Sequence, residues 1–417
     1  MLLSRRSCLL GLAALSLPGC MGGGVPMSAP AARTAPMRPE ANPEFDRWKA
    51  AFRGRATGAG IPSSVVGPAL DGAGFLPDVI ERDRRQAEFT RTLEDYINAI
   101  AVSDERIAGG LAALSRHGST LRAIEDRYGV EAEVIAAVWG LESRYGAERG
   151  DVPVISALAT LAFDGRRGAF FESQLLAALR ILQRGDTSAA NMRGSWAGAM
   201  GHTQFIPTTY QDYAVDFTGN GRRDIWAEDP ADALASAANY LARMGWQRGQ
   251  PWGVEVRLPQ GFDTGLAGRG STRSASDWAG LGLRDMEGGQ PPAHGPASLI
   301  LPDGPRGPAF LVYRNFSVIL RYNNSEFYAI GVGHLADRLR GAGPIRGSFQ
   351  PDRFGLRLAE RQELQERLTR AGFDTQGVDG VIGPNSQEAI RAYQRARGIS
   401  ETGTPSSDLL ERLRRGA

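Results

Sequence analysis

The sequence has little lysine, little cysteine and no long apolar run. Lys49 is the only lysine among 417 residues and the formal net charge is +2, so the charge balance does not indicate a nucleic-acid partner. No run of 18 apolar residues occurs, so no conventional transmembrane helix is predicted. The two cysteines are Cys8 and Cys20, both near the N-terminus. The sequence therefore predicts neither a disulfide nor a zinc site in the folded body, which must be held together by its core.

An export signal is predicted over residues 1–20. Two arginines precede the apolar stretch Cys8–Leu17, and a glycine precedes Cys20. The Leu-Pro-Gly-Cys ending resembles a bacterial lipobox, which implies that Cys20 becomes the lipidated first residue of the mature chain. The alternative is ordinary signal cleavage, in which Cys20 is incidental. The paired arginines leave the general and the twin-arginine export routes open.

Residues 21–42 are rich in proline, alanine and glycine and show no periodicity, which is typical of a flexible tether. Met21 follows Cys20, where an aspartate is associated with retention in the inner membrane. We therefore expect a periplasmic protein whose lipid anchors it to the outer membrane.

The folded body is predicted to be α+β and mainly helical, with a small inserted β subdomain. Helical spacing predicts helices over Ser63–Leu70, Pro77–Arg85, Glu88–Ala101, Thr120–Tyr128, Glu131–Arg144, Pro153–Phe163, Ala169–Gln183, Pro230–Met244 and Phe327–Leu339, and a helix through Ser115 that Ser103 caps. Short β-like runs lie at Val254–Leu258, Ser298–Leu301, Ala309–Tyr313 and Ser317–Arg321. This body spans residues 43–340, and a Gly/Pro/Arg linker over 341–355 joins it to a module at 356–415.

A glutamate near the end of an apolar helix is the first candidate for chemistry. Glu142 lies in V-W-G-L-E-S-R-Y-G, at Val138–Gly146, and borders an apolar stripe that includes Val138 and Leu141. A carboxyl there is partly desolvated, which raises its pKa and suits a general acid near neutral pH. The alternative is a helix-end glutamate that is solvated or paired with Arg144.

The stretch G-S-W-A-G-A-M-G-H-T-Q-F-I-P-T-T-Y, at Gly194–Tyr210, is the second candidate. Its glycines and alanines do not form an amphipathic helix. The pattern suits a backbone that approaches a ligand closely, with Ser195 and Gln204 as polar contacts. The alternative is a structural loop that the glycines make possible.

An EF-hand-like spacing of oxygen donors occurs in Asp216–Asp229. The donors are Asp216, Thr218, Asn220 and Asp224. The last ligand position, where a bidentate glutamate is expected, holds Ala227, although Glu228 or Asp229 follows directly. We expect weak calcium binding or none, and the alternative is a Gly-Asn-Gly turn with solvated acids.

The C-terminal module reads as three helices with turns at Gly372–Gly383 and Gly398–Gly403. Asn385 or Ser386 is expected to cap the middle helix. The turn D-G-V-I-G, which begins at Asp379, resembles that of the type 1 peptidoglycan-binding domain. The resemblance implies a module that holds the protein on the cell wall.

Three blocks in order resemble the membrane-bound lytic transglycosylase B family of murein-cleaving enzymes. They are W-G-L-E-S-R-Y-G, the Gly194–Tyr210 stretch and R-Y-N-N-S-E-F-Y-A at Arg321–Ala329, and the resemblance covers residues 43–340. It implies a lysozyme-like fold in which Glu142 protonates the oxygen between N-acetylmuramic acid and N-acetylglucosamine. Glu142 then takes the proton of the muramyl C6 hydroxyl, which attacks C1 and leaves a 1,6-anhydro end. Such a reaction needs no second carboxylate.

By the same resemblance, Ser195 and Gln204 position Glu142 and the substrate. The further residues expected at the cleft are Tyr322, Asn323, Tyr328, Tyr240 and Tyr96. Aromatic faces bind sugar rings, although core packing is the alternative for each tyrosine. The sequence departs from the family at His202–Thr203, where an aromatic-glycine pair is expected, and at Phe170, where another cleft tyrosine is expected.

The sequence therefore predicts a lipid-anchored lytic transglycosylase with a wall-binding domain. We expect that the reaction requires no cofactor and that any bound metal is structural calcium. The expected partners are peptidoglycan glycan strands, the membrane, and proteins of cell-wall synthesis or hydrolysis. The alternatives are a hydrolytic muramidase of the same fold and a non-catalytic wall-binding scaffold. Exclusion of water from the cleft would distinguish the transglycosylase from the muramidase. The scaffold is disfavoured because it would need none of the residues Glu142, Ser195, Gln204 and Asn323.

Overall fold

The computed structural model describes residues 37–84 and 92–416, which belong to two compact units. Unit 1 contains the described residues up to Arg84, Ser119–Tyr128 and Val138–Tyr240, and unit 2 contains the other described residues. The predicted signal, Cys20 and most of the predicted tether lie outside the described residues. Within the described ranges, every helix is too short or too polar to cross a bilayer.

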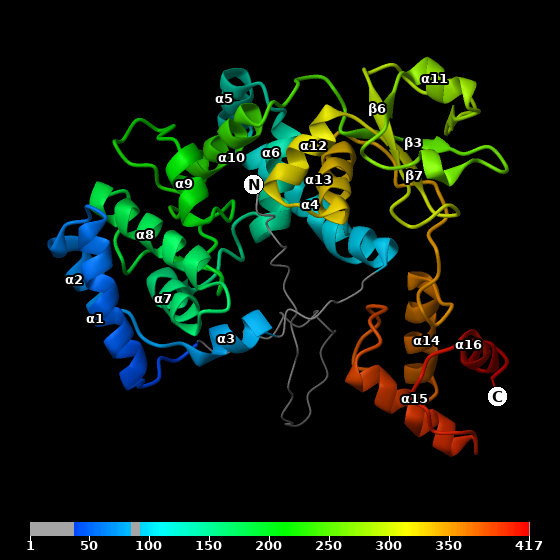
Figure 1. Cartoon of the computed structure of the whole chain (residues 1–417). Coiled ribbons are helices and arrows are strands. Elements are labelled where there is room, and N and C mark those ends of the chain that lie inside the picture. Colours follow the sequence, from blue (N-terminus) through cyan, green and yellow to red (C-terminus); the bar gives the residue numbers. More distant parts are fainter. Residues whose placement is uncertain (1–36, 85–91, 417) are drawn as a thin grey trace. The chain divides into compact units, whose positions relative to one another are not determined.

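Unit 1 is built from helices (Figure 1). Its elements are α1 (Pro43–Gly58), α2 (Ser63–Asp71), α3 (Pro77–Arg84), α5 (Gly118–Tyr128), the second half of α6 (Ala132–Ser143), β1 (Val152–Pro153), α7 (Val154–Asp164), α8 (Gly168–Arg184), β2 (Arg193–Gly194), α9 (Pro207–Tyr213) and most of α10 (Ala231–Arg243). Every residue of α7 from Val154 to Ala162 is buried, because α1, α3 and α8 all pack against this helix. The predicted helices over Pro153–Phe163 and Ala169–Gln183 are confirmed to within one residue at each end.

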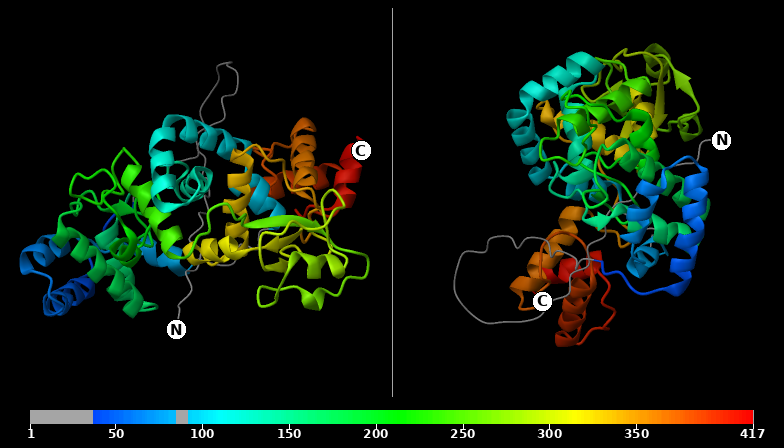
Figure 2. Two further views of the ribbon diagram at one scale, coloured as in Figure 1. Left: turned by 90° about the horizontal axis from the view of Figure 1, so that it is seen from above. Right: turned by 90° about the vertical axis from the view of Figure 1, so that its left-hand side faces the viewer.

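Unit 2 contains the predicted β subdomain, whose strands are yellow-green in Figures 1 and 2. Its sheet is antiparallel, with the order β4 (Thr272–Arg273), β6 (Ala297–Ile300), β7 (Ala309–Val312), β3 (Gly253–Arg257) and β5 (Arg284–Asp285). The strands β6 and β7 are buried throughout. Trp278, on the short helix α11 (Ala275–Gly280), is fully buried beside Leu299 and Leu311. The insertion therefore has a hydrophobic core of its own.

One predicted strand is wrong. Residues Ser317–Arg321 lie in a helix, α12 (Arg314–Tyr322), and helix α13 (Glu326–Leu339) follows it. The buried residues of α12 include Phe316, Ile319 and Tyr322, which recur at the spacing of a helix. A short apolar run does not distinguish a strand from a buried helix, because the tertiary partners decide. The predicted helix over Phe327–Leu339 is confirmed, and the hydroxyl of Ser325 caps it.

The predicted helix over Glu88–Ala101 is only partly α-helical. Residues 88–91 lie outside the described residues, and Asp95–Ala101 form a π-helix, η1. Each π-helical turn holds more residues than an α-helical turn, so a period of 3.6 does not predict which side chains are buried. The next helix, α4 (Asp104–Arg116), begins where predicted, with the hydroxyl of Ser103 accepting from the Arg106 N–H.

The C-terminal module has the three predicted helices, α14 (Leu358–Arg370), α15 (Pro384–Ala396) and α16 (Ser407–Arg414). The predicted cap of the middle helix is wrong, because Asn385 and Ser386 both lie inside its first turn and Gly383 is the N-cap. The buried hydroxyl of Ser386 instead accepts from the side chain of Gln365 at 3.1 Å. Proline at the first helical position places the N-cap of α15 at Gly383, two residues before Asn385 and three before Ser386.

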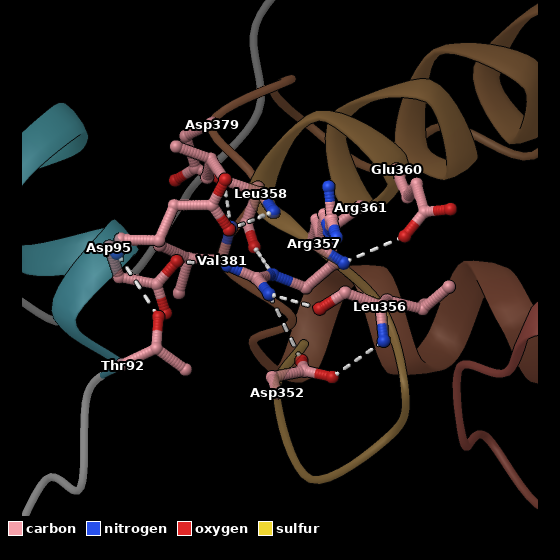
Figure 3. A network of polar contacts seen from close by, with 12 residues as sticks. Thr92, Asp95, Asp352, Leu356, Arg357, Leu358, Glu360, Arg361, Asp379 and Val381 are labelled. Carbon is pink, nitrogen blue, oxygen red and sulfur yellow. Dashed lines mark hydrogen bonds and ion pairs between the residues drawn. The ribbon is translucent and has the colours of Figure 1, made fainter. Parts of the chain in front are cut away.

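Arg361, on α14, is a buried charge that joins three segments of unit 2 (Figure 3). Its side chain is 4% exposed. Nη1 lies 3.1 Å from Oδ2 of Asp352, and Nε donates to the Gly380 carbonyl at 2.8 Å. Nη2 forms an ion pair with Asp95, on η1. We call this set of contacts the Arg361 clamp.

A second contact beside the Arg361 clamp also reaches η1. The backbone N–H of Leu358 donates to Oε2 of Glu94 at 2.8 Å. Burial raises the pKa of the Glu94 carboxyl, against the opposing effect of this hydrogen bond. The first turn of the module is therefore bonded to two consecutive acidic residues.

The predicted linker over 341–355 is bonded to the β subdomain. The Arg346 and Gly347 N–H groups both donate to the carboxylate of Glu255, the first at 2.9 Å. The Gln350 N–H donates to Asp303 at 2.5 Å. Acidic side chains of the β subdomain therefore hold this segment in place, whereas a flexible Gly/Pro-rich linker would make no such contacts.

Candidate active site

Glu142 lies where helix α6 emerges from the interior. Residues Val134 to Gly140 are buried on all sides of the helix, whereas Leu141 and Glu142 are half-buried. The predicted apolar stripe is thus a fully buried helix segment. Glu142 is the first acidic residue beyond that segment, one position before the end of α6 at Ser143.

The turn after α6 has an unusual backbone. Arg144 and Tyr145 have φ of 47° and 56°, and Gly146 has φ of 90°. Non-glycine residues rarely adopt positive φ, and each costs roughly 1–3 kcal/mol unless its surroundings impose it. Gln204, at φ 51°, is one of only two further such residues in the described part of the chain. Strained backbone conformations therefore occur directly after Glu142 and at Gln204, another predicted site residue.

Side-chain hydrogen bonds hold the end of α6 to the glycine-rich stretch. The Trp139 indole N–H donates to Nδ1 of His202 at 3.1 Å. The Ser143 hydroxyl donates to the His202 carbonyl oxygen at 2.6 Å. All three residues are at most 3% exposed. We call Trp139, Ser143 and His202 the His202 clamp.

The glycines of Gly194–Tyr210 lie against protein atoms. A Cβ on Gly201, whose φ is 68°, would lie 2.3 Å from the Ile225 carbonyl oxygen, and one on Gly194 would lie 2.1 Å from that of Ala199. The structural-loop alternative accounts for these two positions, because the close approach is between two parts of the chain.

Ser195 and Gln204 are both half-buried residues of this loop. The Ser195 hydroxyl accepts from the Ala199 N–H at 3.0 Å and so closes the turn. The amide nitrogen of Gln204 donates to the carbonyl oxygens of Arg149 at 3.0 Å and Gly201 at 2.8 Å. The loop thus fixes the orientation of both side chains, and unit 1 contains both together with Glu142.

The predicted cleft tyrosines are divided between the units. Tyr240 is in unit 1, where its ring lies 4.8 Å from that of Tyr213, and it is 4% exposed. Tyr96, Tyr322 and Tyr328 are in unit 2 and are at most 5% exposed, while Asn323 there is half-buried. Contact of these side chains with a sugar stays a prediction.

Phe170, at the position of another expected cleft tyrosine, is an exposed ring on α8. It is 38% exposed and packs edge-on against Phe171, with ring centroids 5.1 Å apart. Arg167 also lies over it, 5.9 Å from the ring centre. An accessible apolar face is thus present in unit 1 without a hydroxyl group at its rim.

The EF-hand-like loop directs its acidic groups toward backbone N–H groups. Asp216 accepts from the N–H of Gly219 at 2.7 Å and of Gly221 at 2.8 Å. Although desolvation opposes them, these hydrogen bonds lower the pKa of the Asp216 carboxyl. Glu228 pairs with Arg149 at 2.6 Å. Among the described residues, no group of three or more acidic, histidine or cysteine side chains is arranged to hold a metal, so calcium binding stays a prediction.

Two family models match this chain. One, described as a transglycosylase SLT domain, matches residues 44–337, and the other, a peptidoglycan binding domain, matches residues 357–413. The chain belongs to the transglycosylase SLT domain family. This membership confirms the family predicted from the three sequence blocks and supports an enzyme that acts on peptidoglycan.

Named relatives agree with this SLT-family assignment. Membrane-bound lytic murein transglycosylase B from Escherichia coli (strain K12) is 35% identical over 242 residues, which are 56% of this chain and 64% of that protein. The chain thus spans less than two thirds of that relative. The crystal structure of SltB3 from Pseudomonas aeruginosa in complex with NAG-anhNAM-pentapeptide has 48% identity and a TM-score of 0.73, covering 89% of this chain and 100% of that chain. The crystal structure of SltB1 from the same organism has 30% identity and a TM-score of 0.62. The match covers 70% of this chain and 99% of that chain.

The solved SLT-family neighbours support the mainly helical, lysozyme-like fold with a separate peptidoglycan-binding domain. Sequence reasoning missed Trp139, Ser143 and Arg149 as parts of the site. His202 was noticed only as a departure from the family pattern. A buried tryptophan and a buried serine one helical turn apart both need hydrogen-bond partners, which is a signal that the sequence contains. The sequence does not show that the partner is His202, which lies 59 residues beyond Ser143.

Proposed function

We propose that this protein is a lytic transglycosylase that cleaves the β-1,4 bond between N-acetylmuramic acid and N-acetylglucosamine of peptidoglycan. The observation that carries the proposal is Glu142 itself. It is a half-buried carboxyl at the end of a buried helix, beside a strained turn, in a chain of the transglycosylase SLT domain family. The NAG-anhNAM-pentapeptide bound by SltB3 supports an anhydro product.

The reaction uses Glu142 twice. As a general acid it protonates the glycosidic oxygen while the C1–O bond of the muramyl residue breaks. The carboxylate then accepts the proton of the muramyl C6 hydroxyl, whose oxygen forms the new bond to C1. One proton is given and one is taken, so Glu142 returns to its starting state and no water is consumed. A single carboxyl is sufficient, in contrast to the two carboxyl groups of ordinary glycosidases.

Other side chains are proposed to bind the glycan strand and to orient it relative to Glu142. Ser195 and Gln204 are proposed to position Glu142 and the substrate, and Asn323 is proposed to line the cleft. Tyr96, Tyr240, Tyr322 and Tyr328 are proposed to support the walls of the glycan site. Each of these tyrosines is at most 5% exposed, so only a small part of each ring is accessible to a sugar.

The C-terminal module is proposed to bind peptidoglycan and so hold the enzyme at its substrate. Lipidation of Cys20 would anchor the protein in the envelope, on the periplasmic face of the outer membrane. The printed name of the E. coli relative, which calls it membrane-bound, supports an envelope location. Partners among cell-wall synthesis or hydrolysis proteins are also proposed.

No cofactor is proposed for the reaction. Asp216 accepts backbone N–H bonds and Glu228 pairs with Arg149, so a calcium ion would compete with these contacts. Calcium is therefore expected to bind weakly or not at all. Isothermal titration of the apo protein with CaCl₂ tests this, and a submicromolar Kd would contradict it.

Digestion of purified sacculi tests the reaction. The chain from Met21 onward is compared with Glu142→Gln and with the control Glu148→Gln, which changes a nearby glutamate that pairs with Arg144 at 3.4 Å. We expect anhydro-ended muropeptides from the wild type and from Glu148→Gln, and none from Glu142→Gln. Reducing-end products that Glu142→Gln abolishes would indicate a hydrolase. Sacculus binding without any release would indicate a scaffold and would overturn the enzymatic proposal.

A further inference from the structure

Helix α6 carries Glu142 at its end, so whatever fixes the last turn of α6 also fixes the backbone position of Glu142. Two residues of that turn, Trp139 and Ser143, bond to His202. We propose that His202 is a positioning residue for Glu142. The inference rests on the proposed function, because it gives His202 a part in the reaction assigned to Glu142.

The two bonds hold the helix end at separate points. Trp139 and Ser143 are four residues apart and therefore lie on one face of α6, one turn from each other. Trp139 bonds to the ring of His202, and Ser143 bonds to its backbone carbonyl. Two attachments a turn apart oppose both sliding and rotation of the helix end. Glu142 immediately precedes Ser143, so it has little freedom left in its backbone.

The bonds of His202 specify a neutral ring. Nδ1 accepts from Trp139, so the ring proton is on Nε2, which lies 2.7 Å from the Ala227 carbonyl and donates to it. Charged groups beside the ring include Arg149, whose Nη1 lies 3.2 Å from Nε2, and Glu228, which pairs with Arg149. A proton on Nδ1 would meet the indole N–H and would add a cation beside Arg149. The clamp therefore requires the uncharged imidazole.

The turn after α6 is packed closely against His202. A Cβ on Gly146 would lie 2.5 Å from Nδ1 of His202, and the φ of Gly146 is 90°. The N–H of Gly146 also donates to the Ser143 hydroxyl at 3.1 Å. The strained turn at Arg144 and Tyr145 thus ends on a glycine that packs directly against the imidazole.

His202 also links Glu142 to the other polar residue of the loop. Gln204 follows two residues later, and its amide donates to the carbonyl of Arg149, just beyond the strained turn. The segment that follows α6 and the loop that carries Gln204 are therefore bonded at both ends. A change at His202 is expected to shift Glu142 and Gln204 relative to each other, and small misplacements cost large factors in rate.

Three substitutions in the full chain separate positioning from packing. His202→Leu removes both ring bonds, Trp139→Phe removes only the indole donor, and His202→Asn offers Oδ1 as an acceptor in the place of Nδ1. We expect kcat on sacculi to fall at least about tenfold in His202→Leu and Trp139→Phe, with KM within about twofold. His202→Asn is expected to keep at least about a third of kcat. If His202→Leu does not fold, Trp139→Phe and His202→Asn carry the comparison.

Hydrogen exchange of the amides in residues 138–146 supplies a measurement that does not depend on turnover. We expect faster exchange there in His202→Leu and near-native exchange in His202→Asn. Wild-type kcat in His202→Leu, equal losses in His202→Leu and His202→Asn, or unchanged exchange would each overturn the role of His202. If the wild type releases no anhydro product, the proposed function fails and the catalytic role fails with it, while altered exchange would still show that His202 holds α6.

Discussion

The two units each contain a buried clamp, and the clamps differ in charge. In unit 1, the His202 clamp holds the helix end beside Glu142 with an indole, a hydroxyl and an uncharged imidazole. In unit 2, the Arg361 clamp joins α14 to η1 with a guanidinium and two carboxylates. A buried cation near a carboxyl favours its ionised form and lowers its pKa. Neutral bonds therefore suit the neighbourhood of Glu142, the proposed general acid, whereas no acid is proposed in the C-terminal module.

The largest effect is expected where a buried charge loses its partner. Arg361→Met leaves Asp95 and Asp352 without their guanidinium, which should lower the free energy of unfolding by about 3–5 kcal/mol. Urea unfolding measures it. The matched control is Arg370→Met, on the same helix, whose 65% exposed side chain pairs with Glu366. It should cost less than about 1 kcal/mol. Equal losses in both variants would contradict the clamp.

His334, a buried histidine on α13, should make the stability of the protein depend on pH. Burial lowers the pKa of His334 to about 4, from an ordinary value of 6.5. Between these values the unfolded chain binds a proton that the folded chain does not, so the free energy of unfolding falls as the pH falls. The total loss is about 3 kcal/mol, complete near pH 4.

Urea unfolding between pH 7 and pH 4 measures this dependence. His334→Gln should make it shallower, because the residue that gains the proton on unfolding is gone. The control His294→Gln changes an exposed side chain and should leave the dependence as it is. A wild-type stability that rises on acidification would contradict the prediction.

The smallest effect is expected for one neutral bond of the His202 clamp. Ser143→Ala leaves the buried His202 carbonyl without its 2.6 Å donor, which should cost about 1–3 kcal/mol of unfolding free energy. Ser173→Ala is the control, since its hydroxyl donates to the Phe170 carbonyl on an exposed helix face. That change should stay within about 0.5 kcal/mol. Similar values for the two serines would remove the distinction between the clamp and an ordinary surface bond.

Local patterns in the sequence predicted most of the fold. The helices α7 and α8, the Ser103 cap and the β6 and β7 strands follow from periodicity and turn residues, because short-range geometry determines them. The Ser317–Arg321 strand was wrong because its burial comes from tertiary neighbours, which no short window contains. The π-helix η1 was also not predicted, because the spacing of apolar residues in the sequence does not distinguish it from an α-helix.

The candidate site was predictable in its residue types and not in its connections. Glu142, Ser195 and Gln204 stand out as polar residues in unusual settings. Nothing local indicates that Ser143 bonds to a carbonyl 59 residues away, or that the helix ends in two left-handed non-glycine residues. Such features depend on which segments meet, so they are properties of the assembled chain.

The Arg361 clamp also sets an order of events during folding. Asp95 and Arg361 are 266 residues apart, and closing so long a loop in an unfolded chain costs roughly 5 kcal/mol of entropy beyond a constant term. This contact therefore forms late, after the intervening helices and strands have shortened the path. A chain made from its N-terminus onward holds Glu94 and Asp95 without their partners until its last domain is complete. The wall-binding module thus finishes the folding of a segment that is synthesised more than two hundred residues before it.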